Sequence, residues 1–384
     1  MGINLLELKL DLFCHGLRLD ASLDPAIKKT IIPAPGYSGR GMKRASLSEG
    51  RCFSLEQEGK IYPVNLAVRE PFVKDSPYAF TVLNGQGWIK KEDKPIIKAA
   101  PTGVPSWHFD PEIRNIFQHH GNDVIATTLS NVCSYKQSAG GCKFCALETG
   151  GEFVIKKPEE MSRALKRIIE ENELSAYRSM HGEKEYLSFR EVNINSGSLS
   201  EEATFNLYLK AIQAIRRVSA IPISIQICPI SRPRVKELKM AGLDTISFNM
   251  EIYEEKIRKE LMPEKAKLYS VGVYLEAIKQ AVDIFGRNQV SSWLIAGLEP
   301  PEGTIAGCKA ICENGGIPHV TAFRPLMGSP LEHLPPPGLN SLVKIYKELK
   351  NLMIMYSLNP LEHKAGCVRC GCCCALKEVL GEGL

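Results

Sequence analysis

The sequence predicts an α/β protein in which six strand–helix units form an open, partial barrel. From residue 123 onward, short apolar β-branched runs alternate with longer segments whose apolar residues recur at helical spacing. Serial units of this kind give parallel strands joined by right-handed crossovers, and six units are fewer than the eight of a closed barrel. A small N-terminal β-rich segment precedes the barrel and a cysteine-rich C-terminal extension follows it. We expect three regions, at 1–105, 106–335 and 336–384.

The composition is that of a globular protein with one large core. The chain has 384 residues, of which 44% are hydrophobic and 24% are charged. The leucine-rich start is interrupted by acidic residues, so we expect a short packed helix rather than a signal peptide or a membrane span. The net charge of +5 is not gathered in one block. We therefore expect no nucleic-acid partner, no membrane association and a cytoplasmic location.

Three short strands are predicted in the N-terminal segment. Each is a β-branched or aromatic run, and residue pairs typical of tight turns follow the first and the third. The strands are Arg51–Leu55, Lys60–Val68 and Tyr78–Leu83, and the turns are Glu58-Gly59 and Asn84-Gly85. Residues 101–111 are predicted to form a linker to the barrel.

The six barrel strands are predicted from apolar runs that end in small or polar residues. They are Asp123–Ser130, Tyr186–Asn195, Ile221–Ile230, Thr245–Glu251, Gln289–Ala296 and His319–Pro325. Helices are predicted from Pro158, from Ser200, at Val235–Met240, after Ser270, at Thr304–Cys312 and at residues 339–356. In barrels of this kind the chemistry takes place at the C-terminal ends of the strands.

Three cysteines follow the first barrel strand in a single loop. Cys133, Cys142 and Cys145 are spaced by nine and three positions, and Gly140 and Gly141 allow the loop to fold back on itself. Thiolates are the usual ligands of iron–sulfur clusters, and such clusters usually take four. Three without a nearby fourth suggest a cluster with one iron left open for a small molecule. A zinc site completed by a distant ligand, or unrelated buried cysteines, are the alternatives.

A second group of cysteines lies in the C-terminal extension. It consists of Cys367, Cys370, Cys372, Cys373 and Cys374. This clustering favours a metal over disulfides. A second iron–sulfur cluster is the favoured interpretation and zinc the alternative, because C-x-x-C is also zinc spacing. Cys367 and Cys370 are the surest ligands, at least one of the other three joins them, and we expect the tail to fold over the barrel mouth.

The cysteine loop and the predicted partial barrel together resemble the radical S-adenosylmethionine (SAM) superfamily. The segment Cys142-Lys-Phe-Cys145 keeps the usual C-x-aromatic-C form of that family, although the spacing from Cys133 is longer than the commonest one. Segments at later strand ends also resemble family motifs for the amino group, ribose and adenine of SAM. These are Ser196-Gly197-Ser198, then Asn249 and Glu251, then Ile295 to Glu299, and the segment from Arg324 to Leu331 resembles one in biotin synthase relatives.

The resemblance implies a radical SAM barrel that binds a 4Fe–4S cluster and SAM. The family cleaves SAM by one-electron reduction to methionine and a 5′-deoxyadenosyl radical. By analogy, Phe144 would pack over the adenine edge, with a purely structural role as the alternative, and the alternative for Glu251 is a surface carboxylate. Arg258 and Arg324 would bind carboxylates of SAM or substrate, with plain salt bridges as the alternative for both arginines. The resemblance assigns no catalytic side chain.

Within the biotin-synthase-like branch, the chain resembles the archaeal-type two-protein lipoyl synthases. That narrower resemblance implies sulfur insertion into an octanoyl chain on a lipoyl-carrier protein, with the second cluster as sulfur source. It also implies a partner radical SAM protein and a reductant such as ferredoxin or flavodoxin. The alternatives are a radical SAM enzyme of another reaction, such as rearrangement or methylation, and a non-enzymatic iron–sulfur or zinc protein.

Several other residues are predicted to have no functional part. His119 and His120 precede the first barrel strand and are expected at the surface. Cys228, Cys308 and Cys312 lie on a predicted strand and a predicted helix, and are expected to be small buried hydrophobic residues.

Overall fold

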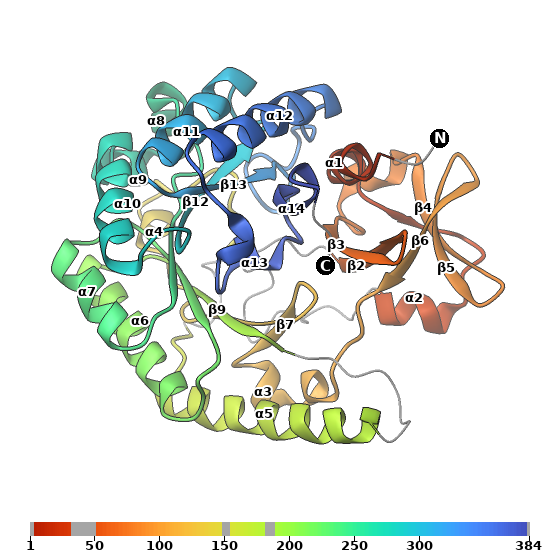
Figure 1. Ribbon diagram of the computed structural model, residues 1–384, viewed down its shortest axis with the longest axis horizontal. Helices are drawn as coiled ribbons and strands as arrows, with labels where there is room; N and C mark the ends of the chain where they lie inside the picture. Colours follow the sequence, from red (N-terminus) through yellow and green to blue (C-terminus); the bar gives the residue numbers. More distant parts are fainter. Residues whose placement is uncertain (1–3, 32–50, 148–153, 181–188, 382–384) are drawn as a thin grey trace.

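The computed structural model describes residues 4–31, 51–147, 154–180 and 189–381, which contain two β-sheets (Figure 1). The larger sheet consists of β7 (Gln118–His120), β8 (Val124–Thr128), β9 (Glu191–Asn195), β10 (Ile223–Ile227), β11 (Thr245–Phe248), β12 (Val290–Ala296) and β13 (Ile317–Ala322). β8 to β13 are parallel and lie in chain order, while β7 pairs antiparallel with β8 at one edge. The two edge strands do not pair with each other, so the predicted partial six-unit barrel is confirmed.

Helices cover the outer face of this curved sheet (Figure 1). They are α5 (Pro158–Met180), α6 (Glu201–Arg216), α7 (Arg232–Met240), α10 (Val271–Phe285), α11 (Pro301–Glu313) and α12 (Leu339–Met355), with the short α8 (Glu255–Leu261) and α9 (Pro263–Leu268) before α10. Ser200 and Ser270 are N-caps, each accepting a backbone N–H three residues on, as predicted. The second strand starts later than predicted, at Glu191, and residues 186–188 lie outside the described part of the chain.

The N-terminal segment forms the smaller sheet, with α1 (Leu5–His15) beside it. Its strands are β1 (Arg18–Leu19), β2 (Arg51–Gln57), β3 (Lys60–Leu66), β4 (Tyr78–Leu83), β5 (Gln86–Lys91) and β6 (Lys94–Pro101), and α2 (Pro25–Ile31) precedes β2. The predicted strands and both turns are confirmed, and Glu58 and Asn84 have the positive φ that such turns require. β5 and β6 were not predicted, because their many lysines conceal the strand pattern.

The predicted linker is instead a packed segment. It contains a 3-10 helix, Ser106–Phe109, and α3 (Pro111–Arg114), and Trp107 and His108 are buried there. The expectation that His119 and His120 lie at the surface is also wrong. Both are half-buried, and His119 packs edge-on against Phe189. Burial lowers the pKa of each imidazole to about 4.

The C-terminal extension enters the barrel from the end opposite to the predicted one. Gly366 N donates to Glu191 Oε2 over 2.8 Å, and Thr245 Oγ1 donates to Ala365 O over 2.9 Å. Glu191 and Thr245 are the first residues of their strands, so the tail closes the N-terminal end of the barrel. α13 (Cys367–Cys370) lies inside the curve of the sheet, facing β2 and β3 (Figure 1). α14 (Leu376–Val379) continues toward α1 and α12.

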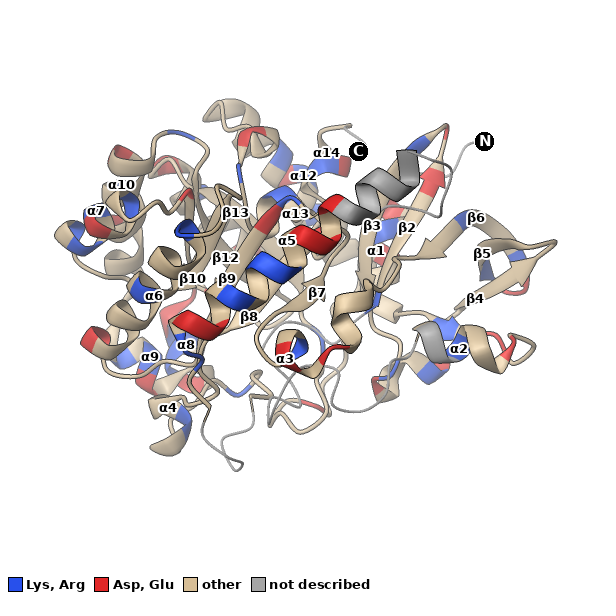
Figure 2. Cartoon of the chain, turned by 90° about the horizontal axis from the view of Figure 1, so that it is seen from below, with Lys and Arg blue, Asp and Glu red and all other residues tan. Residues whose placement is uncertain are grey.

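Charges of both signs are interspersed over the helices, as along α5 (Figure 2). Among the described helices, none combines the length and the apolar composition needed to cross a membrane.

Candidate functional site

A pocket opens where the C-terminal ends of the barrel strands meet the cysteine loop. Most of the residues predicted to bind a cluster or SAM line it: Cys133, Cys142, Phe144, Cys145, Ser196, Gly197, Ser198, Asn249, Glu251 and Ile295. They come from separate segments of the chain that follow different strands. The pocket is therefore the one place where the predicted motifs converge among the residues that the structure describes.

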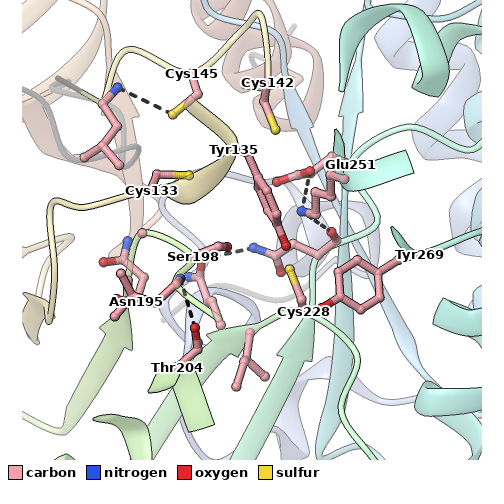
Figure 3. A pocket seen from close by; sticks show the side chains of 18 of the residues that line it. Cys133, Tyr135, Cys142, Cys145, Asn195, Ser198, Thr204, Cys228, Glu251 and Tyr269 are labelled. Carbon is pink, nitrogen blue, oxygen red and sulfur yellow. Dashed lines mark hydrogen bonds and ion pairs between the residues drawn. The ribbon is translucent and has the colours of Figure 1, made fainter. Parts of the chain in front are cut away.

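The three loop cysteines face a common space (Figure 3). Lys136 holds the loop closed, since its Nζ donates to Cys145 O over 2.7 Å and to Leu147 O over 2.6 Å. Leu147 N donates to Cys145 Sγ over 3.4 Å. A backbone donor directed at sulfur suits a thiolate ligand.

Burial raises the pKa of the Cys142 and Cys145 thiols. The pKa of Cys142 lies well above its ordinary value, because the nearby Glu251 carboxylate adds to the effect of burial. Such thiols bind as thiolates only when a metal cation replaces the proton. Within the described ranges, no three His, Cys, Asp or Glu side chains are close enough together to hold one bare metal ion. The donor set is of the soft type that iron–sulfur clusters take.

Gly140 and Gly141 let the loop pack closely, rather than supplying a positive φ. A Cβ on Gly140 would lie 2.1 Å from Glu264 Cγ, and one on Gly141 would lie 2.5 Å from Lys136 Cγ. The positive φ in this loop belongs to Ala139, at 59°. The two glycines therefore leave room for Glu264 of α9 and for Lys136 of the loop to pack against the loop backbone.

The end of β9 is bound directly to the cysteine loop. Gly197 N donates to Ser130 O over 2.9 Å, and Ser134 N donates to Ser198 O over 2.7 Å. A Cβ on Gly197 would lie 2.1 Å from Val132 O, so the two segments can approach only with glycine there. The buried Ser196 Oγ and Asn195 Nδ2 have no hydrogen-bond partner among the described residues. Both residues line the pocket, which suits a polar ligand.

Glu251 occupies a strained position in the pocket wall. Its φ is 70°, in the left-handed region that few non-glycine residues adopt. Lys265 Nζ donates to Glu251 Oε2 over 2.7 Å and to Asn249 O over 3.0 Å. Burial would lower the pKa of Lys265, but Glu251 and the other acidic side chains nearby together outweigh burial, and the pKa lies well above its ordinary value. Lys265 was not predicted, because nothing in α9 marks it as facing a strand end 14 residues earlier.

Further pocket residues were missed or misjudged. Tyr135, Tyr269 and Trp293 line the pocket and give it an aromatic wall. Cys228 was expected to be buried, but it is half-buried and lines the pocket directly after β10 (Figure 3). Its position at a strand end was the signal that could have identified it. Cys308 and Cys312 are buried, as predicted.

The two predicted arginines do not reach the pocket. Arg258 is fully buried, and its guanidinium donates to Met250 O, Ile252 O and Tyr269 O over 2.7–2.9 Å. Arg324 donates to Asn65 O over 2.9 Å and thereby binds β3 to the barrel. Backbone carbonyls hold the Arg258 guanidinium, and Asn65 and Glu70 hold that of Arg324. The cofactor-binding interpretation of both arginines is therefore replaced by a structural one.

The tail cysteines are divided among three environments. Cys370, Cys372 and Cys373 are buried together against Val124. Cys367 faces the barrel interior, where its sulfur accepts from Gln226 Nε2 over 3.3 Å and from Asn193 Nδ2 over 3.5 Å. Cys374 lies instead in the main hydrophobic core.

Comparison with known proteins found one curated relative at a significant level. The chain is 28% identical over 143 residues to the bacteriochlorophyllide c C-7(1)-hydroxylase of Chlorobaculum limnaeum. The match spans 36% of this chain and 36% of the relative, so it covers about a third of that protein. No protein-family model matches the chain.

Solved structures with a similar course of the chain include radical SAM enzymes. HydG, a maturase of the [FeFe]-hydrogenase, matches with a TM-score of 0.47 and 16% identity, over 68% of this chain and 55% of that one. Methylornithine synthase (PylB) matches with a TM-score of 0.46 and 16% identity, over 60% of this chain and 62% of that one. Coproporphyrinogen III oxidase (HemN) of Escherichia coli, described as a radical SAM enzyme, matches with a TM-score of 0.37 and 15% identity, over 56% of this chain and 50% of that one.

Proposed function

We propose that this protein is a radical SAM enzyme whose pocket binds a 4Fe–4S cluster and SAM. The observation that carries the proposal is the convergence of the three loop cysteines with the polar strand ends on one pocket. When bound and reduced, such a cluster supplies the electron that cleaves SAM to methionine and a 5′-deoxyadenosyl radical. Cys133, Cys142 and Cys145 would hold it.

The pocket residues supply the contacts that SAM needs. Ser196 Oγ and Asn195 Nδ2, buried without partners among the described residues, suit its carboxylate and amino groups. Asn249 and Glu251 suit the ribose hydroxyls, and Ile295 an adenine face. The aromatic wall excludes water from the reacting centre.

The reaction we propose is sulfur insertion at unactivated carbons, as in lipoyl synthesis on an octanoylated carrier protein. A second group of cysteines below the pocket supports it, since sulfur insertion needs a sulfur source. Gln226 connects the two, because it lines the pocket, accepts from Asn249 Nδ2 over 3.1 Å and donates to Cys367 Sγ. A ferredoxin or flavodoxin would supply the electrons, and a partner radical SAM protein would share the substrate.

The similarity to a hydroxylase favours a second candidate, a radical SAM reaction of another type on a different substrate. The non-enzymatic alternative has no use for a pocket with unpaired buried polar groups. SAM cleavage separates the enzymatic proposals from the non-enzymatic one, and sulfur in the product separates sulfur insertion from the other reactions.

The test is to incubate reconstituted, reduced protein with SAM and an octanoylated carrier domain. We expect 5′-deoxyadenosine, and carrier masses raised by one or two sulfur atoms. Replacing Cys133, Cys142 and Cys145 with alanine should abolish both products, whereas Cys308→Ala, which removes a buried thiol remote from the pocket, should not. Formation of 5′-deoxyadenosine at the parent rate by the triple variant would refute the proposal.

A further inference from the structure

A cysteine of the N-terminal sheet lies against the cysteines of the tail. Cys52, in β2, is 4% exposed, and its sulfur lies 3.3 Å from Cys372 Sγ. The two residues are 320 positions apart in the chain. Cys52, Cys370, Cys372 and Cys373 form one buried cluster with Val124. Sulfur therefore gathers at the contact between the two sheets.

Two other parts of the chain lie directly against the tail cysteines. Asn65 N, in β3, donates to Cys372 O over 2.8 Å, which fixes the tail against the N-terminal sheet. Gly121 lies in the turn between β7 and β8 with a φ of 61°, and a Cβ there would lie 2.5 Å from Cys370 Sγ and 3.3 Å from Cys372 Sγ. No side chain larger than hydrogen fits beside the two sulfurs. Glycine at position 121 thus leaves the space beside the two sulfurs free of other side-chain atoms.

Hydrogen-bond donors and a positive charge surround the tail cysteines. Two side-chain amides, from Asn193 and Gln226, donate to Cys367 Sγ. Lys377 is 7% exposed, packs over Gly371 in the middle of the cysteine motif, and makes no ion pair with any described residue. A buried cation without a carboxylate partner offsets the negative charge of a thiolate-bound cluster.

We propose that Cys52 is a ligand of a second iron–sulfur cluster, together with Cys367, Cys370 and Cys372. The N-terminal sheet then supplies one ligand and the tail three, and the cluster joins the two parts of the molecule. Cys373 is buried in the same cluster, and Cys374 takes no part because it lies in the main core. The site stands at the N-terminal end of the barrel, below the pocket. It does not depend on SAM chemistry in that pocket.

The experiment starts from the chain in which Cys133, Cys142 and Cys145 are alanine, so that the remaining iron reports on the second cluster alone. After anaerobic reconstitution, iron and acid-labile sulfide per chain are measured with the visible and electron paramagnetic resonance spectra. We expect iron near the content of a single cluster. Adding Cys52→Ala should lower it at least twofold, whereas Cys14→Ala, which removes another buried thiol of the N-terminal region, should leave it unchanged.

Cys52→Ser keeps the fold and provides a second readout. Serine is nearly isosteric, so this variant should still bind a cluster, with shifted resonance signals because one ligand is now oxygen. Unchanged iron in Cys52→Ala, or an unchanged spectrum in Cys52→Ser, would overturn the assignment of Cys52. Stoichiometric zinc without iron in the freshly isolated starting chain would overturn the assignment of an iron–sulfur cluster. Neither result bears on SAM cleavage by the parent protein.

Discussion

Glu251 and Lys265 form a largely buried ion pair at the edge of the pocket, and the pair explains why a carboxylate tolerates a left-handed backbone there. Lys265 bonds to both the Glu251 carboxylate and the Asn249 carbonyl, so it fixes two residues that we assign to the ribose of SAM. Strain of this kind persists where the surroundings over-determine a conformation. The lysine acts by positioning the carboxylate.

Replacing Glu251 with glutamine should weaken SAM binding while iron content is kept. A charge-assisted hydrogen bond is worth roughly 1.5–3 kcal/mol, which corresponds to about a ten- to hundredfold rise in the SAM dissociation constant. Equilibrium binding to the reconstituted protein measures it. Glu260→Gln, on an exposed carboxylate of α8, is the matched control. A dissociation constant equal to that of the control would remove Glu251 from the SAM site.

Lys156 predicts a pH dependence of stability. Burial lowers its pKa to about 7, and its Nζ donates to Ile116 O over 2.7 Å and to Thr127 Oγ1 over 3.0 Å. The unfolded chain keeps the lysine protonated to about pH 10.4, so between about pH 7 and 10 it binds more protons than the folded chain. This group therefore makes the folded state more stable as the pH rises through that window.

The Lys156→Met variant should lose this dependence. Between about pH 7 and 9 the free energy of unfolding of the parent should rise relative to the variant by up to about 2.5 kcal/mol. Urea unfolding of parent and variant at about pH 7 and about pH 9 measures the free energies of unfolding. The titration of the thiols cancels in the comparison, because both proteins contain the same cysteines. A parallel pH dependence of parent and variant would mean that Lys156 stays charged in the fold.

At the scale of the elements, the site depends on close approach between loops that follow different strands. Gly197 brings the end of β9 against the loop after β8, and Gly140 brings the cysteine loop against α9. Backbone carbonyls cannot move aside as flexible side chains do. The cysteine loop is thus held in place by its neighbours as well as by its own hydrogen bonds.

Gly197→Ala should separate β9 from the cysteine loop. The added Cβ would meet Val132 O, a cost on the order of 1–3 kcal/mol, so we expect a lower melting temperature and less iron at the three-cysteine site. Gly272→Ala in α10 is the control, because its Cβ would meet only Ser270 Oγ at an ordinary 3.8 Å. Equal melting temperature and iron content in the two variants would contradict this account.

At the scale of the whole molecule, the tail connects the barrel to the N-terminal sheet. Arg369 binds Asp123 through two hydrogen bonds of 2.5 and 3.0 Å and also binds the fully buried Glu191. Lys9 Nζ, from α1, donates to Gly371 O over 2.9 Å and pairs with Glu378. These buried ion pairs explain why the tail fills the N-terminal end of the barrel and leaves the pocket end open.

Arg369→Met should release the tail. Loss of one partner from a buried ion pair costs about 3–5 kcal/mol, because Glu191 is left without its cation. We expect faster limited proteolysis after α12 and loss of iron from the second site. Arg190→Met is the control, since Arg190 also pairs with Asp123 but is exposed. Equal proteolysis rates in the two variants would show that the tail is held by other contacts.

The sequence by itself determined the barrel strands, their order, the cysteine loop and part of the pocket lining. Periodicity and short spacings reflect the local geometry of the chain, and parallel strands bring their C-terminal ends to one edge. Cys133, Glu251 and Ile295 could therefore be assigned to one site from their positions at strand ends together with the family motifs that their segments resemble. The same reasoning identified the tail cysteines as a group.

Only the tertiary structure decided where that group lies and what joins it. Cys52 contacts Cys372 although the two are 320 positions apart in the chain, and Lys265 reaches Glu251 from a helix without a motif. Arg258 is bound by backbone carbonyls, and Arg324 by Asn65 and Glu70. The tail lies at the N-terminal end of the barrel because buried charges on β9 and the turn before β8 pair with Arg369 there. Such contacts depend on how whole elements pack against one another, and local sequence patterns do not predict that packing.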